Sequence, residues 1–343
     1  MVNQKTLDDQ KKRPSIRPGH WFDSFLSIKR KSRPELPGNK LSRAQRTNLT
    51  FFGFLTPWLF GLIFLTIIPL IISLGISFTN YDGLNWDSLK FVKFNNYLRA
   101  FGDPDVGASL RQTLLWMSVY LPSWLILSFG LAYLLNQIGR AKSFYRALFY
   151  LPSVVPAAAG VTAWMSVLDK NVGLLNGAIS LFKPGTAIGW VSAYSLQVLT
   201  LIVLWASLGT GMIIFLAGLQ NIPEELLEAA RIDGANGLQI LWKVILPLMT
   251  PVFFFQIIIG LISVFQQLTY PLLLVFGGGM GNIGLPPTEI RLYIFNAYHN
   301  IMVGQRFGYG SALLWLLFIG IVLLSLALFW SQRFWVYSDE VTG

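Results

Sequence analysis

Six long stretches of this sequence contain no Asp, Glu, Lys or Arg, and they limit the fold more than any other feature. They cover roughly residues 51–78, 113–137, 147–168, 197–219, 248–276 and 311–330. A helix rises about 1.5 Å per residue, so each stretch can cross a hydrocarbon core of about 30 Å. The runs are continuously apolar and lack the alternation of a membrane β-barrel strand. We therefore expect an all-α polytopic membrane protein with six transmembrane helices.

Basic residues are unevenly distributed among the segments between these stretches. Of the 26 Lys and Arg residues, 18 fall in 1–50, 138–146, 220–247 and 331–343, whereas the intervening segments hold eight. Because cytoplasmic loops accumulate Lys and Arg, this distribution predicts that both termini are cytoplasmic. The net charge of +10 then reflects topology, and we expect no nucleic-acid partner.

The same pattern predicts three parts of the chain. They are a basic cytoplasmic N-terminal tail (1–50), a six-helix transmembrane domain (51–337) and a short C-terminal tail (338–343). The first apolar run is too long for a cleaved signal peptide, so we expect it to be retained as a helix. Binding of the basic tail to anionic membrane lipid is a further option. The chain has no Cys, and its two His residues lie far apart, so no metal site is expected.

The absence of ionisable groups from the six stretches narrows the functional classes. An ion-coupled carrier usually keeps Asp, Glu, His or Lys inside the membrane to bind the coupling ion. An intramembrane enzyme needs a nucleophile with a base, or metal ligands, and the stretches supply neither. The sequence also lacks the G-x-x-x-x-G-K-[ST] phosphate loop of ATP-binding proteins. If the protein pumps a solute, its energy is expected to come from a separate subunit.

The polar segment 220–247 separates the fourth and fifth stretches and contains the sequence PEELLEAARIDGANGLQILWKVILP. A first short helix is predicted after Pro223, because acidic residues near its start complement the helix dipole. Gly234 and Gly237 predict a turn, and a second short helix is predicted over 238–245. Two short amphipathic helices on the cytoplasmic face suit docking to another protein.

The spacing within this segment resembles the EAA motif of binding-protein-dependent ABC importer permeases. That motif reads EAA, three residues, G, nine residues, I, one residue and LP. The matching residues are Glu228, Ala229, Ala230, Gly234, Leu246 and Pro247. Val244 replaces the usual Ile, and Asp233 precedes the glycine, as is common in the family.

Shorter stretches resemble the maltose/glycerol-3-phosphate-type sugar permease subfamily. They read FNNY at 94–97, DP at 103–104, YRALFYLP at 145–152 and GYGSA at 308–312. The resemblance implies the type I ABC importer permease fold and a transport subunit, not an enzyme, in a bacterial or archaeal plasma membrane. It also implies a second permease subunit, expected to form a heterodimer, together with two ATP-binding subunits and an extracytoplasmic solute-binding protein.

The resemblance also implies where ATP is bound and which residues of this chain contact the ATPase subunit. ATP and Mg are expected on the partner subunits, and no cofactor is expected on this chain. The helix carrying Glu228 would insert into a cleft of the ATPase subunit, with Ala229 and Ala230 allowing close approach. Gly234 would make the turn that follows.

In the resembled family the substrate path is lined by the spans that flank the EAA loop, here the fourth and fifth stretches. Polar and aromatic residues there are Trp205, Ser207, Thr210, Ser263, Gln266, Gln267, Thr269 and Tyr270. Two alternatives remain open: Gln266 and Gln267 could bond to the partner permease, and Trp205 could serve packing. A sugar, whether mono-, di- or oligosaccharide, is the favoured cargo because the spans contain no basic group for a phosphate. Glycerol phosphate, another solute, or an ion-coupled carrier function are the alternatives.

Overall fold

The computed structural model describes residues 43–87, 89–139, 141–277 and 288–337. The expected C-terminal tail 338–343 and most of the expected N-terminal tail 1–50 lie outside these residues. The chain divides into two compact units, residues 1–66 and 67–343. The first unit contains α2 (Arg43–Gly61) and all but the last residue of the π-helical turn η3 (Leu62–Ile67). This helix begins before residue 51, inside the segment predicted to be a tail.

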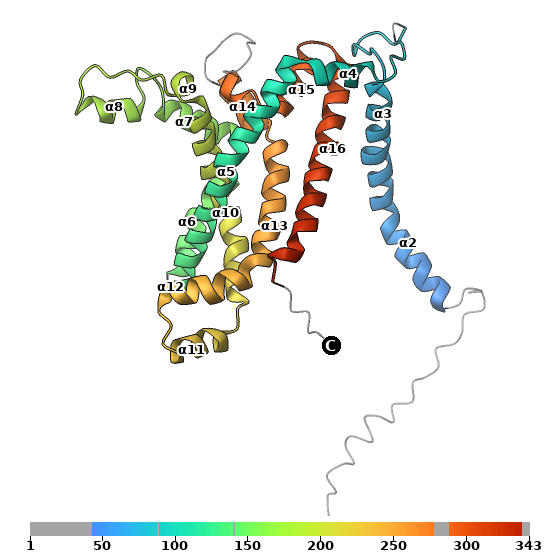
Figure 1. Ribbon diagram of the computed structural model, residues 1–343. Coiled ribbons are helices and arrows are strands. Elements are labelled where there is room, and N and C mark those ends of the chain that lie inside the picture. Colours follow the sequence, from blue (N-terminus) through green and yellow to red (C-terminus); the bar gives the residue numbers. More distant parts are fainter. Residues whose placement is uncertain (1–42, 88, 140, 278–287, 338–343) are drawn as a thin grey trace, which may run out of the picture. The chain divides into compact units, whose positions relative to one another are not determined.

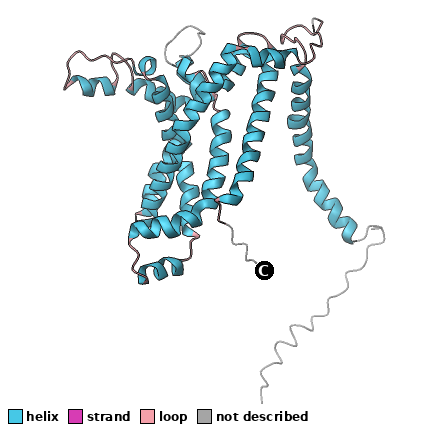
Figure 2. Cartoon of the chain, viewed as in Figure 1, coloured by secondary structure: helices cyan, strands magenta, loops and turns pink. Residues whose placement is uncertain are grey.

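The described part of the second unit is helical, without a named strand (Figure 2). An isolated bridge pairs Thr79 with Phe91. The helices in the first half are α3 (Ile68–Ser77), α4 (Asn95–Gly102), α5 (Pro104–Gln137), α6 (Lys142–Val154), α7 (Ala157–Val167), α8 (Leu174–Ser180), α9 (Trp190–Ala193) and α10 (Ser195–Gln220). Those in the second half are α11 (Glu224–Ile232), α12 (Gly237–Ile240), η4 (Leu241–Ile245), α13 (Leu246–Phe265), α14 (Thr269–Gly277), η5 (Thr288–Ile290), α15 (Tyr293–Met302), α16 (Phe307–Ser331) and η6 (Gln332–Phe334).

Five helical stretches of the described residues are long and apolar enough to span a membrane. They are Leu49–Ser77, Pro104–Gln137, Ser195–Gln220, Gly237–Val275 and Phe307–Phe334. The prediction of one continuous helix over 147–168 is wrong, because α6 and α7 meet there at 96°. Pro156 has no N–H to donate and forces the preceding Val155 into an extended conformation, which ends α6. The chain has six spans only if this bent pair crosses as one.

The expected separate helix over 238–245 is instead the start of the fifth span. Backbone helix runs without a loop from α12 through the π-helical turn η4 into α13. Pro247 cannot donate to the carbonyl one turn earlier, and the wider turn η4 ends two residues before it, at Ile245. The apolar run 248–276 is also interrupted, because Gln266–Leu268 separate α13 from α14.

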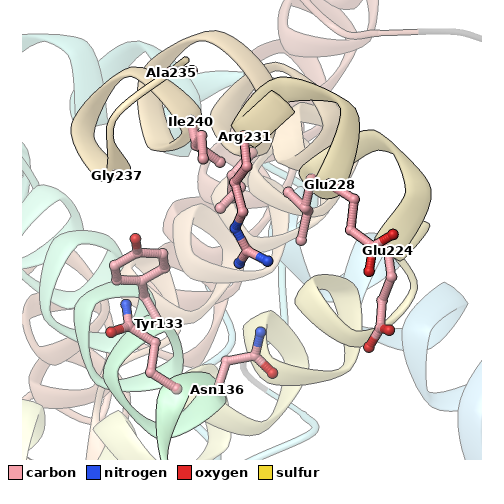
Figure 3. A pocket seen from close by; sticks show the side chains of 11 residues that line it. Tyr133, Asn136, Glu224, Glu228, Arg231, Ala235, Gly237 and Ile240 are labelled. Atoms are coloured by element: carbon pink, nitrogen blue, oxygen red, sulfur yellow. The ribbon is translucent and has the colours of Figure 1, made fainter. Parts of the chain in front are cut away.

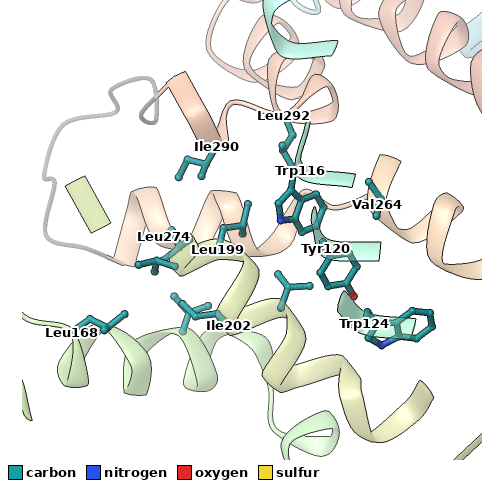
Figure 4. Close-up of a cluster of buried hydrophobic side chains, with 13 residues drawn as sticks. Trp116, Tyr120, Trp124, Leu168, Leu199, Ile202, Val264, Leu274, Ile290 and Leu292 are labelled. Carbon is teal, nitrogen blue, oxygen red and sulfur yellow. The ribbon is translucent and has the colours of Figure 1, made fainter. Parts of the chain in front are cut away.

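The interior is organised around α5 and α10. Two tryptophans of α5 bond to α10: Trp116 Nε1 donates to Thr200 Oγ1 and Trp124 Nε1 donates to the Ser207 carbonyl, both over 3.1 Å. Figure 4 shows the Trp116 ring beside Leu199 of α10, with Tyr120 between Trp116 and Trp124 in the same apolar cluster. Buried tryptophans normally satisfy their N–H in this way, so the bonds fix the register of the two spans.

The second unit has two distinct ends, which we call the α4 end and the α11 end (Figure 1). Helix α5 connects them, because it begins at Pro104 beside α4 and finishes at Gln137 near α11. The described C-terminal residues lie at the α11 end. There the Tyr337 N–H donates to Thr250 Oγ1 over 2.8 Å, near the start of α13.

Candidate docking surface and translocation cavity

Helix α11 forms where the sequence predicts it, and it is almost wholly on the surface. Pro223 is its N-cap, Glu224 and Glu225 occupy its first turn, and none of its residues is buried. The helix ends at Ile232, and the chain turns at Gly234, whose φ is +83°, a conformation that strains any residue with a Cβ. Ala235 N–H donates to the Ala230 carbonyl and Gly234 N–H to the Arg231 carbonyl, both over 3.0 Å. This is a Schellman motif, so the predicted glycine turn is confirmed.

The next helix starts from a reciprocal cap. Asn236 Oδ1 accepts from the Gln239 N–H over 2.9 Å, and Gln239 Oε1 accepts from the Asn236 N–H over 2.8 Å. Such a capping box satisfies two N–H groups that a helix start leaves free. The turn and the box together determine how α11 is held beneath the spans.

A cavity of about 580 Å³ separates α11 from the end of α5. Its lining side chains come from the end of α5 and from the segment 224–245: Tyr133, Asn136, Gln137, Glu224, Leu227, Glu228, Arg231, Ala235, Gly237, Ile240 and Ile245. Figure 3 shows the Arg231 guanidinium reaching into the middle of this space, between Glu228 and the α5 residues Tyr133 and Asn136. Glu228 therefore faces a cavity within this chain as well as the surface.

The remaining residues of the EAA segment do not lie together. Ala229 is exposed, whereas Ala230 is half-buried against the apolar cluster at this end of the bundle. Asp233 is the exposed C-cap of α11. Leu246 and Pro247 line a separate apolar groove of about 520 Å³, together with Trp242, Thr250, Phe253, Ile257 and Trp335. The two halves of the motif thus form different surfaces, and their role in coupling stays a prediction.

A second cavity, of about 230 Å³, lies between the spans. Its lining residues come from α5, α10, the end of α13 and the start of α14: Tyr120, Trp124, Val203, Ala206, Ser207, Thr210, Ile259, Gly260, Ser263, Gln267 and Tyr270. Tyr120 and Ser207 each lie near the middle of their helix. The cavity brings together five residues predicted for the substrate path, namely Ser207, Thr210, Ser263, Gln267 and Tyr270. Whether they contact a solute remains a prediction.

Hydrogen bonds within this cavity orient its polar groups. Tyr120 Oη and Ser207 Oγ are 3.0 Å apart, and Ser207 Oγ donates to the Val203 carbonyl over 2.7 Å. Thr210 and Ser263 likewise donate to carbonyls of their own helices, over 2.7 and 2.8 Å. A hydroxyl that has donated its proton keeps acceptor capacity. The cavity is thus suited to a ligand that donates hydrogen bonds, and its lining side chains are all of neutral residue types.

Three residues predicted for the path do not line this cavity. Trp205 packs edge-on against Trp164, with centroids 6.0 Å apart, and lies close over Gly160 of α7. This contact favours packing for Trp205. Gln266 and Thr269 are exposed beside the break between α13 and α14. The structure therefore separates Gln266 from its neighbour Gln267.

The sequence interpretation missed the aromatic wall that α5 contributes. It considered only the two spans that flank the EAA segment, whereas Tyr120 and Trp124 project from α5 into the cavity. Trp116, Tyr120 and Trp124 follow one another at intervals of four residues. That spacing places the three side chains on one helix face, and it is the sequence feature from which this aromatic wall could have been predicted.

Comparison with known proteins identifies the fold and the family. The chain is 33% identical over 305 residues to the probable ABC transporter permease protein YesP of Bacillus subtilis (strain 168), covering 88% of this chain and 96% of that protein. It is 29% identical over 241 residues to the sn-glycerol-3-phosphate transport system permease protein UgpA of Yersinia pestis bv. Antiqua, covering 69% and 79%. It is 25% identical over 288 residues to the probable starch degradation products transport system permease protein AmyD of Thermoanaerobacterium thermosulfurigenes, covering 83% and 94%.

The fold matches that of a chain in the crystal structure of a bacterial ABC transporter involved in the import of the acidic polysaccharide alginate. The TM-score is 0.71 at 18% identity, and the match covers 87% of this chain and 97% of the other. The family described as "Binding-protein-dependent transport system inner membrane component" matches residues 106–336. The chain belongs to this family and is a membrane-spanning permease subunit of an ABC importer of the plasma membrane, a transport subunit and not an enzyme.

Proposed function

We propose that the cavity between α5, α10, α13 and α14 is this chain's share of the path for a neutral sugar. The supporting observation is its lining, which combines hydroxyl, amide and aromatic groups from neutral residues. Hydroxyls and an amide can bond to sugar hydroxyls, and aromatic faces can cover the C–H surfaces of a ring. At about 230 Å³ the cavity is smaller than the roughly 300–1,000 Å³ typical of drug-sized ligands. It therefore suits one sugar unit at a time, from a free sugar or from a longer chain.

The neutral lining of the cavity helps to decide which relative transports a solute similar to that of this chain. UgpA is named for sn-glycerol-3-phosphate, and the solved importer is described as taking acidic alginate, so both cargoes are anionic. AmyD is named for starch degradation products, which are uncharged. An anion inside a membrane needs a cationic partner, and no Lys or Arg lines this cavity. A neutral sugar is the consistent choice, with glycerol phosphate as the alternative.

We further propose that energy enters through α11. Its exposed surface and the cytoplasmic location predicted for 220–247 suit insertion into an ATPase groove. ATP and Mg would be held by two ATP-binding subunits, and a second permease subunit, expected to be a different chain, would complete the path. An extracytoplasmic solute-binding protein would deliver the sugar, in keeping with the family's dependence on binding proteins. In this orientation both termini are cytoplasmic and the α4 end faces outward.

The test is uptake by the complete transporter, purified with its native partners and reconstituted in proteoliposomes. The panel contains a neutral maltooligosaccharide, sn-glycerol-3-phosphate and an alginate oligosaccharide, each with and without ATP. We expect ATP-dependent uptake of the neutral sugar alone. Uptake restricted to an anionic solute would contradict the assignment of the cavity, and uptake without any ATPase would instead support an ion-coupled carrier.

A further inference from the structure

The short helix α4 is fixed to the bundle by one face. Its side chains Asn96 and Ala100 are buried. Asn96 Nδ2 donates to the carbonyls of Ser77 and Thr79, each over 2.8 Å, and the Tyr97 hydroxyl lies 2.7 Å from Ser77 Oγ. These contacts hold α4 against the last residues of α3 and set which face it turns away from the bundle.

The opposite face of α4 is apolar and uncovered. Phe94, Leu98 and Phe101 are 64%, 69% and 80% exposed. Their spacing of four and three residues places them on one side of the helix, opposite Asn96 and Ala100. A contiguous row of large apolar side chains is unfavourable in water and usually marks a surface that another phase or molecule covers.

The position of α4 indicates what covers this face. Three spans end beside it: α3 finishes at Ser77, α5 begins at Pro104 and α16 begins at Phe307. The α16 start is tied to the same region, because Tyr309 Oη donates to Asp103 Oδ2 over 2.6 Å and the Gly308 N–H donates to the Tyr81 carbonyl over 2.9 Å. Spans end at the boundary between hydrocarbon and water, so α4 lies at that boundary.

The residues around the apolar face have the composition of a membrane interface. Phe78 contacts the rings of Phe91 and Phe94, with centroids 6.4 and 5.3 Å apart, in a cluster of the kind found in interfacial aromatic belts. Lys90 and Lys93 precede the helix and are exposed. Arg99 lies on its polar flank, with its guanidinium 4.6 Å from the centroid of the Tyr309 ring. Basic residues beside an apolar helix face are suited to lipid phosphates.

We propose that α4 is an interfacial anchor, whose Phe94, Leu98 and Phe101 face inserts into the phospholipid surface at the α4 end. Its occupant is the bilayer itself, between the headgroups and the upper acyl chains. The anchor fixes the depth at which the connection between α3 and α5 meets the membrane. In the orientation proposed above, this surface is the outer leaflet.

Site-directed spin labelling tests the proposal directly, because the chain has no native cysteine to replace. Leu98→Cys and Phe101→Cys report on the apolar face, Asn95→Cys on the exposed polar flank and Ala100→Cys on the buried face. Each full-length variant is labelled with a nitroxide in the assembled transporter, in vesicles of phosphatidylethanolamine and phosphatidylglycerol. Collision with oxygen, which partitions into lipid, is compared with collision with a water-soluble nickel chelate.

We expect the oxygen-to-nickel collision ratio at positions 98 and 101 to exceed that at position 95 several-fold. A ratio at 98 and 101 equal to that at 95 would show a water-exposed face and overturn the proposal. Exclusion of both reagents, as expected at position 100, would also overturn it, because a protein partner would then cover the face. Leu98→Cys and Phe101→Cys both replace exposed side chains. If one of these variants fails to assemble, the collision ratio of the other is sufficient to test the proposal.

Discussion

The cavity between the spans and the cavity under α11 differ both in chemistry and in how they are held. The cavity between the spans has a neutral lining, positioned by long helices whose buried tryptophans bond across α5 and α10. The cavity under α11 is lined by Glu224, Glu228 and Arg231 and closed by a helix without a single buried residue. The first is part of a packed interior, and the second depends on one turn and one cap.

The difference suggests a division of labour. A solute site benefits from groups that keep their positions, because ordering them on binding would cost affinity. A surface that docks to an ATPase must instead be exposed and can be completed by its partner. Variants in the span cavity are therefore expected to change solute affinity, and variants near α11 are expected to change the use of ATP.

The largest effect is expected from Gly234→Val. The positive φ at Gly234 is unfavourable for any L-residue and most of all for a β-branched one. A left-handed conformation costs about 1–2 kcal/mol, which corresponds to about a tenfold loss of ATPase binding. Gly237→Val is the matched control, because a Cβ at either glycine meets nothing within 4 Å and only Gly234 has a positive φ. Co-purification of the ATPase and ATP-dependent uptake are measured, and equal losses in both variants would refute the role of the turn.

A smaller effect, on solute affinity, is expected from Gln267→Leu. This amide lines the cavity, and loss of a hydrogen bond of about 1 kcal/mol raises the KM for sugar uptake roughly fivefold. The neighbouring Gln266→Leu is the control, since Gln266 is exposed and does not line the cavity. If Gln266→Leu instead weakens association with the second permease subunit, Gln266 has the alternative role of a hydrogen bond to that subunit. A KM unchanged by Gln267→Leu would remove the residue from the path.

The smallest effect is expected from Glu228→Lys compared with Glu225→Lys. Both residues are exposed on α11, but only Glu228 lines the cavity beside Arg231. Exposed charge pairs contribute about 0.2–1 kcal/mol, so we expect a loss of coupled uptake of about fivefold at most, with membrane insertion intact. The ratio of ATP hydrolysed to sugar imported is the measurement. Identical behaviour of the two variants would show that only the overall charge of α11 matters.

Local features of this chain were predictable from the sequence because they depend on neighbouring residues. The start of α11 after Pro223 and the turn at Gly234 both follow from backbone preferences within a few positions. The apolar runs likewise gave the positions of five spans. Hydropathy does not show whether an apolar run is straight or bent, however. The bend at Pro156 was therefore not predicted, although the proline is present in the sequence.

Features that depend on packing between distant segments were not predictable. Tyr120 reaches the cavity only because α5 packs along α10, which brings its hydroxyl to Ser207, 87 residues later in the chain. The spacing of the EAA motif likewise did not show how its residues are arranged in space. The continuous helix from Gly237 onward carries Leu246 and Pro247 away from Glu228 and into another groove.

That continuity between α12 and α13 has a mechanical consequence. No loop separates the cap at Asn236 from the last residue of α13 at Phe265, so the backbone is helical over residues 237–265, a length of about 44 Å at about 1.5 Å per residue. We expect a displacement imposed at its α12 end to be transmitted along the helix, because no loop intervenes. The far end is the break at Gln266–Leu268, one turn from the Tyr270 side of the cavity, so in the proposed function a movement of α12 would reach the cavity proposed for the sugar.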